Sequence, residues 1–215
     1  MSDRNTNQRL SKSLSRLYRK KKPGVFARKL HHYGFGADRF MWWWWQDIVN
    51  FGDWIGPELF AFRTGRLPIY APVYKRPSNS AVHVTVGSIM TGLMVSDVAT
   101  VWGSGILDIQ KNFAKPREIR AVRGPLTRQR CLDQGYPCPD IYGDPGLLVS
   151  DIYSERDAAA SVDVGIVPHF QDTEAATKSF GTRDDVRIID VRRPLGEVVS
   201  DILGSRLVLS SSMHG

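Results

Sequence analysis

The chain has 215 residues, of which 42% are hydrophobic and 24% charged, a composition typical of a globular protein with a sizeable core. Its net charge of +7 comes from the first 30 residues, which hold 10 Lys or Arg against the single acid Asp3. The remaining residues carry 19 basic and 21 acidic side chains, so the body of the protein has no basic excess that would favour nucleic acid as a partner.

Residues 1–33 are predicted to form a basic amphipathic tail. The apolar side chains that share one helical face in this segment are Leu10, Leu14, Leu17 and Tyr18. Such a helix can lie on an anionic membrane surface or dock on a partner, although a frayed, solvated terminus and contact with nucleic acid remain open. No apolar run reaches the ~20 residues of a membrane span, and no signal-peptide core follows the basic residues. We therefore expect a cytoplasmic protein, peripheral on the inner membrane where the tail docks.

Four consecutive tryptophans, residues 42–45, precede an Asn-Phe-Gly-Asp stretch. The tryptophans form either a strand covered on both faces or the wall of a groove for a sugar. The sequence predicts that residues 50–53 form a loop and that a helix follows, capped by Asp53 and ended by Gly65. This loop would lie at the carboxyl end of a strand, where open α/β sheets bind ligands.

Short β-branched runs then alternate with helical patterns along the rest of the chain. The expected strands lie at 81–89, 99–106, 118–124, 161–170, 186–191 and 205–212, and the expected helices at 124–135 and 194–205. This alternation predicts an α/β fold with parallel, doubly wound sheets. We expect a first α/β domain over 34–150, a connector over 151–161 and a second domain over 162–215, which is incomplete because its sheet face would need further elements to cover it.

Small or polar residues follow several of these strands. Gly103, Ser104 and Gly105 follow one strand, His169 follows another, and a serine triplet with His214 follows the last. Together they indicate a cleft at the carboxyl edge of the sheets. The two cysteines, Cys131 and Cys138, are predicted to be reduced and non-catalytic, and no second pair completes a metal site.

Five segments, taken in order, resemble the polysaccharide pyruvyltransferases, including the branch that acts in bacterial exopolysaccharide synthesis. They are "NFGDWIGPELFAFRTG", "VWGSGI", "VRGPLTRQRCLDQGYPCPDIYGDPGLL", "VGIVPHF" and "LVLSSSMHG", and the match runs from about residue 40 to residue 215. The resemblance implies two Rossmann-like domains in a GT-B-like arrangement. It also implies transfer of pyruvyl from phosphoenolpyruvate to a lipid-linked oligosaccharide or polysaccharide, which forms a cyclic ketal and needs no redox cofactor.

The resemblance also suggests roles for particular residues. The catalytic candidates are His214, His169 and Asp53; the donor-binding candidates are Arg123, Gly103, Ser104, Gly105, Ser211 and Ser212; the acceptor-binding candidates are Asn50, Trp44 and Trp45. Histidine suits proton transfer near neutral pH, and arginine or backbone amides suit a phosphate and a carboxylate. Three of these residues also have a structural alternative. His214 could cap a following helix, His169 could simply end a strand, and Arg123 could form a surface ion pair. Many family members carry arginine where this chain has Ser212, so the phosphate would rely on amides and another arginine.

Two other functions stay open. A GT-B-type glycosyltransferase would use a nucleotide sugar on the same layout, and it would need a site for base and ribose. An inactive membrane-surface fragment or scaffold would use only the basic tail.

Overall fold

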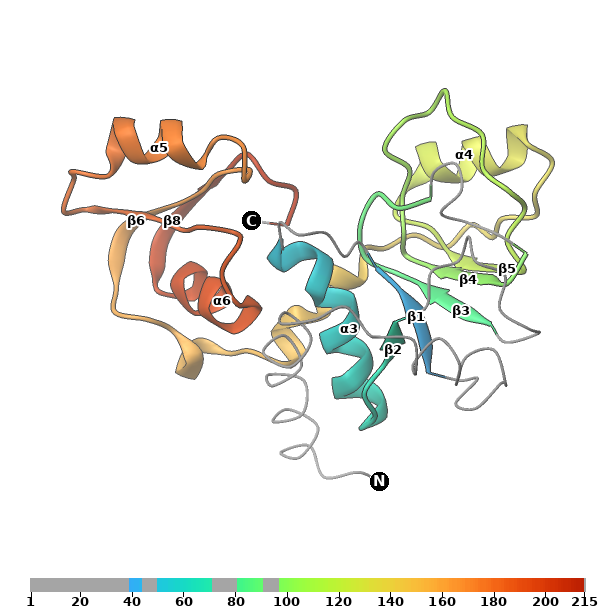
Figure 1. Cartoon of the computed structure of the whole chain (residues 1–215), viewed down its shortest axis with the longest axis horizontal. Coiled ribbons are helices and arrows are strands. Elements are labelled where there is room, and N and C mark those ends of the chain that lie inside the picture. The colour runs from blue at the N-terminus through green and yellow to red at the C-terminus, as the bar shows by residue number, and fades with distance from the viewer. Residues whose placement is uncertain (1–38, 44–49, 71–80, 91–96, 215) are drawn as a thin grey trace.

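The computed structural model describes residues 39–43, 50–70, 81–90 and 97–214 and shows an α/β chain with two parallel sheets (Figure 1). The first sheet has the order β2-β1-β3-β4-β5, and the second has the order β7-β6-β8. The strands are β1 (Phe40–Trp42), β2 (Ile69–Tyr70), β3 (Val82–Val84), β4 (Ala99–Trp102), β5 (Glu118–Ala121), β6 (Val162–Val167), β7 (Val186–Ile188) and β8 (Ser205–Ser210). The predicted α/β class with parallel, Rossmann-like sheets is confirmed.

The middle strands of the first sheet are largely buried, with Met41 and Thr100 buried on one face and an apolar cluster on the other. Phe40, Trp42, Val82, Val84 and Val101 are buried in one hydrophobic cluster around β1, β3 and β4. The order 2-1-3-4-5 is one of the common orders of doubly wound sheets, and such sheets bind ligands outside the carboxyl ends of their strands. The fold therefore directs attention to the loops that follow β1, β3, β4 and β5.

Four α-helices and two 3₁₀ helices accompany the strands among the described residues. They are α3 (Phe51–Thr64), α4 (Pro125–Asp133), η1 (Pro145–Asp151), η2 (Glu155–Asp157), α5 (Thr173–Phe180) and α6 (Leu195–Leu203). The predicted helices over 124–135 and 194–205 are α4 and α6, and α6 buries Val198 and Val199 of its predicted apolar face. Sequence patterns did not predict α5, η1 or β2, because these elements are short or weakly periodic.

Helix α3 begins three residues earlier than predicted. Asn50 caps it, with its side-chain oxygen accepting a hydrogen bond from the amide of Gly52 at 2.9 Å, so residues 51–53 form the first turn and not a loop. The helix also runs through Pro57, which lies in its second turn. Its end was predicted correctly, since Gly65 takes the left-handed conformation with φ 66°.

Helix α3 joins the two sheets through a common core. Phe51, Ile55, Leu59 and Phe62 pack in one hydrophobic cluster with apolar residues of the second unit, which include Val167, Ile189, Val191, Leu195 and Val198. The amide of Phe51 donates to the carbonyl of Val191 at 2.8 Å, and Arg63 pairs with Asp151. Figure 1 shows α3 lying between the two sheets. Ile152 and Tyr153 of the predicted connector are buried in this same cluster, so the two units pack through a continuous core.

The described part of the tryptophan run belongs to the core. Trp42 and Trp43 are 3% and 2% exposed, and the Trp43 ring packs edge-on against Trp54 and Tyr70 at centroid distances of 5.7 and 4.9 Å. The prediction of a strand covered on both faces is therefore confirmed for Trp42 and Trp43. Trp44 and Trp45, like the predicted tail over 1–33, lie outside the described residues.

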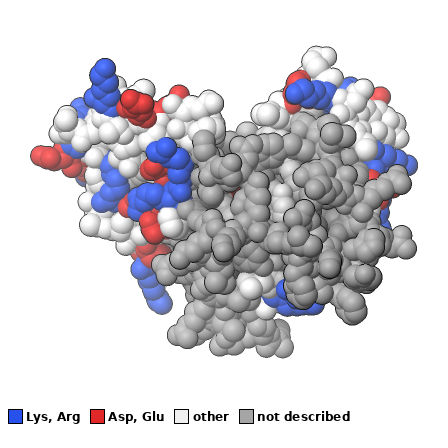
Figure 2. All heavy atoms as spheres, viewed as in Figure 1, with Lys and Arg blue, Asp and Glu red and all other residues white. Residues whose placement is uncertain are grey.

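Charges on the second unit are largely balanced. Its arginines form ion pairs with neighbouring acids, including Arg183 with Asp185, Arg192 with Asp190, Arg193 with Glu197 and Asp201, and Arg206 with Asp163. Figure 2 shows basic and acidic side chains intermixed on this lobe, and a hollow between the two lobes. None of the described helices is long and apolar enough to cross a membrane.

Candidate functional site

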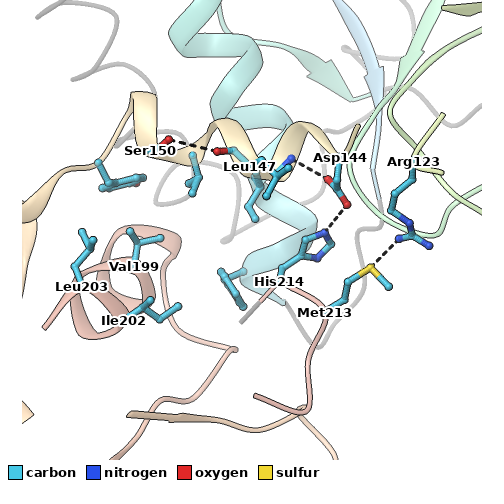
Figure 3. Close-up of a pocket in the computed structure, with 14 residues that line it drawn as sticks. Arg123, Asp144, Leu147, Ser150, Val199, Ile202, Leu203, Met213 and His214 are labelled. Atoms are coloured by element: carbon cyan, nitrogen blue, oxygen red, sulfur yellow. Dashed lines mark hydrogen bonds and ion pairs between the residues drawn. The ribbon is translucent and has the colours of Figure 1, made fainter. Parts of the chain in front are cut away.

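A cavity of about 560 Å³ lies where the loop after β8 meets the first unit. Arg123 follows β5, Asp144 precedes η1, and Met213 with His214 follows β8, and all four side chains line one part of the cavity (Figure 3). Helices α3 and α6 and the helix η1 form the rest of the wall. The site thus lies at the carboxyl edge of both sheets, where a ligand site is expected in this class of fold.

His214 is held between two elements of the first unit. Its Nε2 atom lies 3.2 Å from Oδ2 of Asp144, whose Oδ1 atom accepts the amide hydrogen of Gly146 at 2.8 Å. Its Nδ1 atom lies over Gly52 in the first turn of α3, only 2.9 Å from where a Cβ would stand. Glycine at position 52 is therefore required for this approach. With Asp144 accepting from Nε2, the neutral ring carries its hydrogen on Nε2 and leaves Nδ1 as the acceptor.

Asp144 was not among the predicted site residues, because an Asp-Pro pair is most often only part of a turn. Burial favours the neutral acid, but hydrogen bonds from His214 and the Gly146 amide, with the nearby charges of His214 and Arg123, lower the pKa of Asp144 below its ordinary value. Asp144 is thus an ionised partner for His214. The Asp-Pro-Gly sequence, in which the aspartate accepts from the amide two residues later, is the local signal that could have identified it.

Asp53 lies in the same region, in the first turn of α3. Burial raises the pKa of Asp53 to about 7, and the charge of His214 offsets part of that rise. A carboxyl group with this pKa keeps a proton in a large fraction of molecules at neutral pH. His214 thus lies near two carboxyl groups of different character, the ionised Asp144 and Asp53, which keeps its proton in a large fraction of molecules.

Arg123 supplies a positive charge to the cavity. Its guanidinium packs on Gly105, where a Cβ would come within 2.6 Å of Cζ, so glycine makes room for it. Its Nη1 atom donates to the sulfur of Met213. A thioether is a weak acceptor, so the guanidinium retains hydrogen-bonding capacity for a carboxylate or phosphate.

The Gly103-Ser104-Gly105 turn positions Arg123, and its own polar groups are already occupied. The amides of Gly103 and Gly105 donate to the carbonyls of Ala121 and Gly87, both at 3.0 Å, and the buried Ser104 hydroxyl donates to Gly87 at 2.9 Å. These two amides and this hydroxyl therefore have no hydrogen left to donate to an anion, and the donor-binding role expected of the turn gains no support from them. Gly103 has φ 89° and lies so close to Pro145 that a Cβ would stand 2.2 Å from its Cδ atom.

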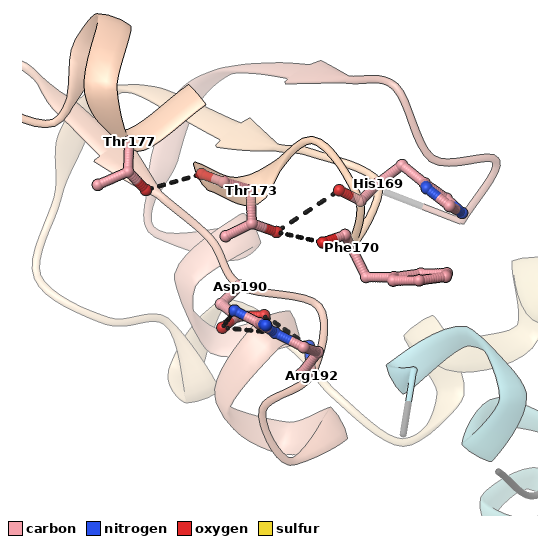
Figure 4. Close-up of polar contacts among 6 residues, drawn as sticks. All are labelled: His169, Phe170, Thr173, Thr177, Asp190 and Arg192. Atoms are coloured by element: carbon pink, nitrogen blue, oxygen red, sulfur yellow. Dashed lines mark hydrogen bonds and ion pairs between the residues drawn. The ribbon is translucent and has the colours of Figure 1, made fainter. Parts of the chain in front are cut away.

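His169 and Ser211 lie together at the end of β6, away from the residues that line the cavity. The amide of His169 donates to the Ser211 hydroxyl at 2.9 Å, and that hydroxyl donates to Asp172 at 3.3 Å. Figure 4 shows the His169 ring beside Phe170, with the centroids 4.2 Å apart. His169 is therefore not brought into the group around His214. Ser212 uses its amide to bond the Ser210 hydroxyl at 2.9 Å, which closes the turn before His214.

The predicted acceptor-binding group is placed only in part. The Asn50 oxygen is occupied as the cap of α3, which leaves its side-chain amide as the group that could contact a ligand. Trp44 and Trp45 lie outside the described residues. The acceptor-binding role predicted for Asn50 therefore competes with its role as the cap of α3.

Cys131 and Cys138 are buried free thiols in the core of the first unit. Burial, together with the neighbouring Cys138, raises the pKa of Cys131 to about 12, which makes it a poor nucleophile. In the part of the chain that the structure describes, no group of three His, Cys, Asp or Glu side chains is placed to hold a metal ion.

A comparison of the chain with protein-family models, with curated proteins and with solved structures finds no match. The chemistry of the site must therefore be argued from its own geometry. An ionised carboxylate, an imidazole and a guanidinium line one cavity, and the carboxyl group of Asp53 lies near enough to His214 for its pKa to respond to the charge of the imidazole. This set can bind an anion and move protons to and from a ligand beside it.

Proposed function

We propose that the chain is a pyruvyl transferase of the polysaccharide pyruvyltransferase type, with its two sheets in a GT-B-like arrangement. The observation that carries the proposal is the meeting of His214, Asp144 and Arg123 in one cavity at the carboxyl edges of both sheets, with Asp53 near enough to respond to the charge of His214. The donor is phosphoenolpyruvate, bound through its phosphate or carboxylate by Arg123. The acceptor is a sugar of a lipid-linked oligosaccharide or polysaccharide, met on the cytoplasmic side of the membrane.

The reaction needs one proton donor and one proton acceptor. Protonation of the donor's methylene carbon gives an oxocarbenium-like centre, which one sugar hydroxyl attacks with loss of its proton to a base. The bond to phosphate then breaks, the second hydroxyl closes on the new cationic centre, and its proton leaves with the phosphate or a base. The products are a cyclic ketal and inorganic phosphate, with no change in oxidation state.

The pKa pattern at the site suggests which group does which task. Asp53, whose pKa is about 7, is suited to give a proton at neutral pH. His214, oriented by the ionised Asp144, is suited to take the hydroxyl proton. Asp53 has a raised pKa and Asp144 a lowered one, and carboxyl groups whose environments push their pKa values apart are a common basis for dividing acid and base tasks.

The test is an incubation with phosphoenolpyruvate, with a nucleotide sugar, or with neither, in each case with lipid-linked oligosaccharide present. Only the incubation with phosphoenolpyruvate should release phosphate and give an acceptor heavier by one ketal-linked pyruvate. The mass increase is measured by mass spectrometry of the acceptor. Release of nucleotide would instead support a glycosyltransferase. If neither product forms, and circular dichroism shows that the protein is a folded α/β chain, the result would contradict both enzymatic functions and favour the membrane-surface scaffold.

A further inference from the structure

The cavity beside His214 has two chemically different ends. The polar end holds Arg123, Asp144 and His214, whereas the far end is lined mainly by aliphatic side chains from α3, η1 and α6, together with Ser150 and the buried Tyr153. We name this far end the apolar arm and define it by Ile55, Leu147, Val199, Ile202 and Leu203. Figure 3 shows Val199, Ile202 and Leu203 on one side of the cavity, Arg123, Asp144 and His214 on the other, and Leu147 between the two groups.

The apolar arm is poorly suited to a polar ligand group. None of its five defining side chains carries a hydrogen-bonding atom, and the neighbouring Ser150 hydroxyl donates to the carbonyl of Leu147 at 3.3 Å. A nucleobase or a second sugar placed there would give up hydrogen bonds to water without replacing them, which costs free energy. A hydrocarbon group would instead gain free energy in proportion to the area it buries.

The two ends are continuous, so one molecule can occupy both. We propose that the site binds a glycoside whose apolar aglycone is attached directly to the reacting sugar, with the sugar hydroxyls at His214 and Asp144 and a hydrocarbon chain in the apolar arm. This inference rests on the proposed function for the identity of the sugar end. The placement of the hydrocarbon chain rests only on the lining of the cavity. It narrows the class of acceptor to a sugar that carries no further polar saccharide on its aglycone side.

The experiment measures binding of glucose and of hexyl, heptyl and octyl β-glucoside to the full chain by calorimetry, without phosphoenolpyruvate and below the concentrations at which the glucosides form micelles. The affinity should rise by about fourfold for each added methylene, the equivalent of ~0.8 kcal/mol per buried CH₂. Equal affinities across the series would overturn the inference.

A matched pair of variants locates the effect. Leu147, in the arm, and Leu126, on α4 away from the cavity, have similar exposures of 78% and 73%, so neither substitution removes a core contact. Leu147→Asp should weaken octyl glucoside binding by about tenfold, the equivalent of one to two buried methylenes, while leaving glucose binding unchanged. Leu126→Asp should change neither. Equal weakening by both variants would show non-specific adsorption and contradict the inference.

The binding series and the transfer assay fail independently. Chain-length dependence without pyruvyl transfer would support the apolar arm and contradict the proposed function. Pyruvyl transfer to glucosides at a rate and affinity independent of chain length would support the function and contradict the apolar arm.

Discussion

Asp53 offers the sharpest physical test of the site, because burial raises its pKa to about 7. The change is Asp53→Asn, which keeps the shape of the side chain and removes its titration. A buried carboxyl group is stable in its neutral form and costly in its ionised form. The folded protein should therefore lose stability, relative to the variant, as pH rises and Asp53 is forced to ionise.

The magnitude follows from the two pKa values. The unfolded chain releases the proton near the ordinary value of 3.8, and the folded chain near 7. Between these values the folded state binds more protons than the unfolded state, so the free energy of unfolding falls with rising pH and then levels off above the folded pKa. A difference of about three units at 1.36 kcal/mol each gives roughly 4 kcal/mol in total.

The assay is urea denaturation of the protein and of Asp53→Asn at pH 4, 5, 6, 7 and 8, followed by circular dichroism. The variant should gain about 4 kcal/mol of relative stability between pH 4 and pH 8, with most of the gain between pH 4 and pH 7. Asp184→Asn, at an exposed position between α5 and β7, is the control and should give a constant difference. A constant difference for Asp53→Asn as well would refute the buried, neutral carboxyl group.

Three further substitutions test the surroundings of the site. Asp144→Asn should show the opposite trend to Asp53→Asn, because the lowered pKa of Asp144 contributes stability that is present above its ordinary pKa and lost as pH falls. Urea denaturation over pH 2 to 6 would measure the difference in the free energy of unfolding between the protein and the variant. A difference that does not change with pH would argue against the pairing with His214. Gly52→Ala should keep the fold but lower turnover by at least tenfold, since its Cβ would stand 2.9 Å from Nδ1 of His214; full activity of this variant would show that the ring does not pack there during turnover. Trp43→Ala should cost about 3 to 5 kcal/mol in the free energy of unfolding, because the ring is buried against Trp54 and Tyr70, and a loss below about 1 kcal/mol would contradict its place in the core.

Local patterns in the sequence predicted much of the fold. The strands of the second sheet follow β-branched runs such as Val162–Val167, and Gly65 ends α3 because only a residue without a Cβ takes φ 66° at no cost. Each of these signals acts within a few residues of the chain. Elements with weak or short patterns, such as α5 and η1, were therefore missed.

The candidate site depends on contacts that no local pattern carries. His214 was predicted from its place after a strand, but its partner Asp144 lies 70 residues away. The two meet because both η1 and the second unit pack against α3. The Gly103-Ser104-Gly105 turn shows the opposite case. Its composition is typical of an anion site, yet the sequence gives no sign that neighbouring strands already occupy its amides.

The packing between the two units was likewise not visible in the sequence. Two α/β units with a connector suggest bodies that move, and a pattern does not reveal that Phe51 and Ile55 of α3 pack into the core of the second unit. Packing of this kind places Asp53 and His214 at one site without a rearrangement. The first turn of α3, and not a free loop, is therefore what positions Asp53.

The central claim is that pyruvyl transfer takes place at His214, and the most direct measurement is phosphate release from phosphoenolpyruvate with acceptor present, by the protein and by His214→Gln. The account predicts a fall in turnover of about 100-fold to 10,000-fold, the usual share of a general acid or base, with the fold and the donor affinity unchanged. His83→Gln, in the middle of β3 and outside the cavity lining, should keep its turnover. Undiminished pyruvyl transfer by His214→Gln would contradict the account.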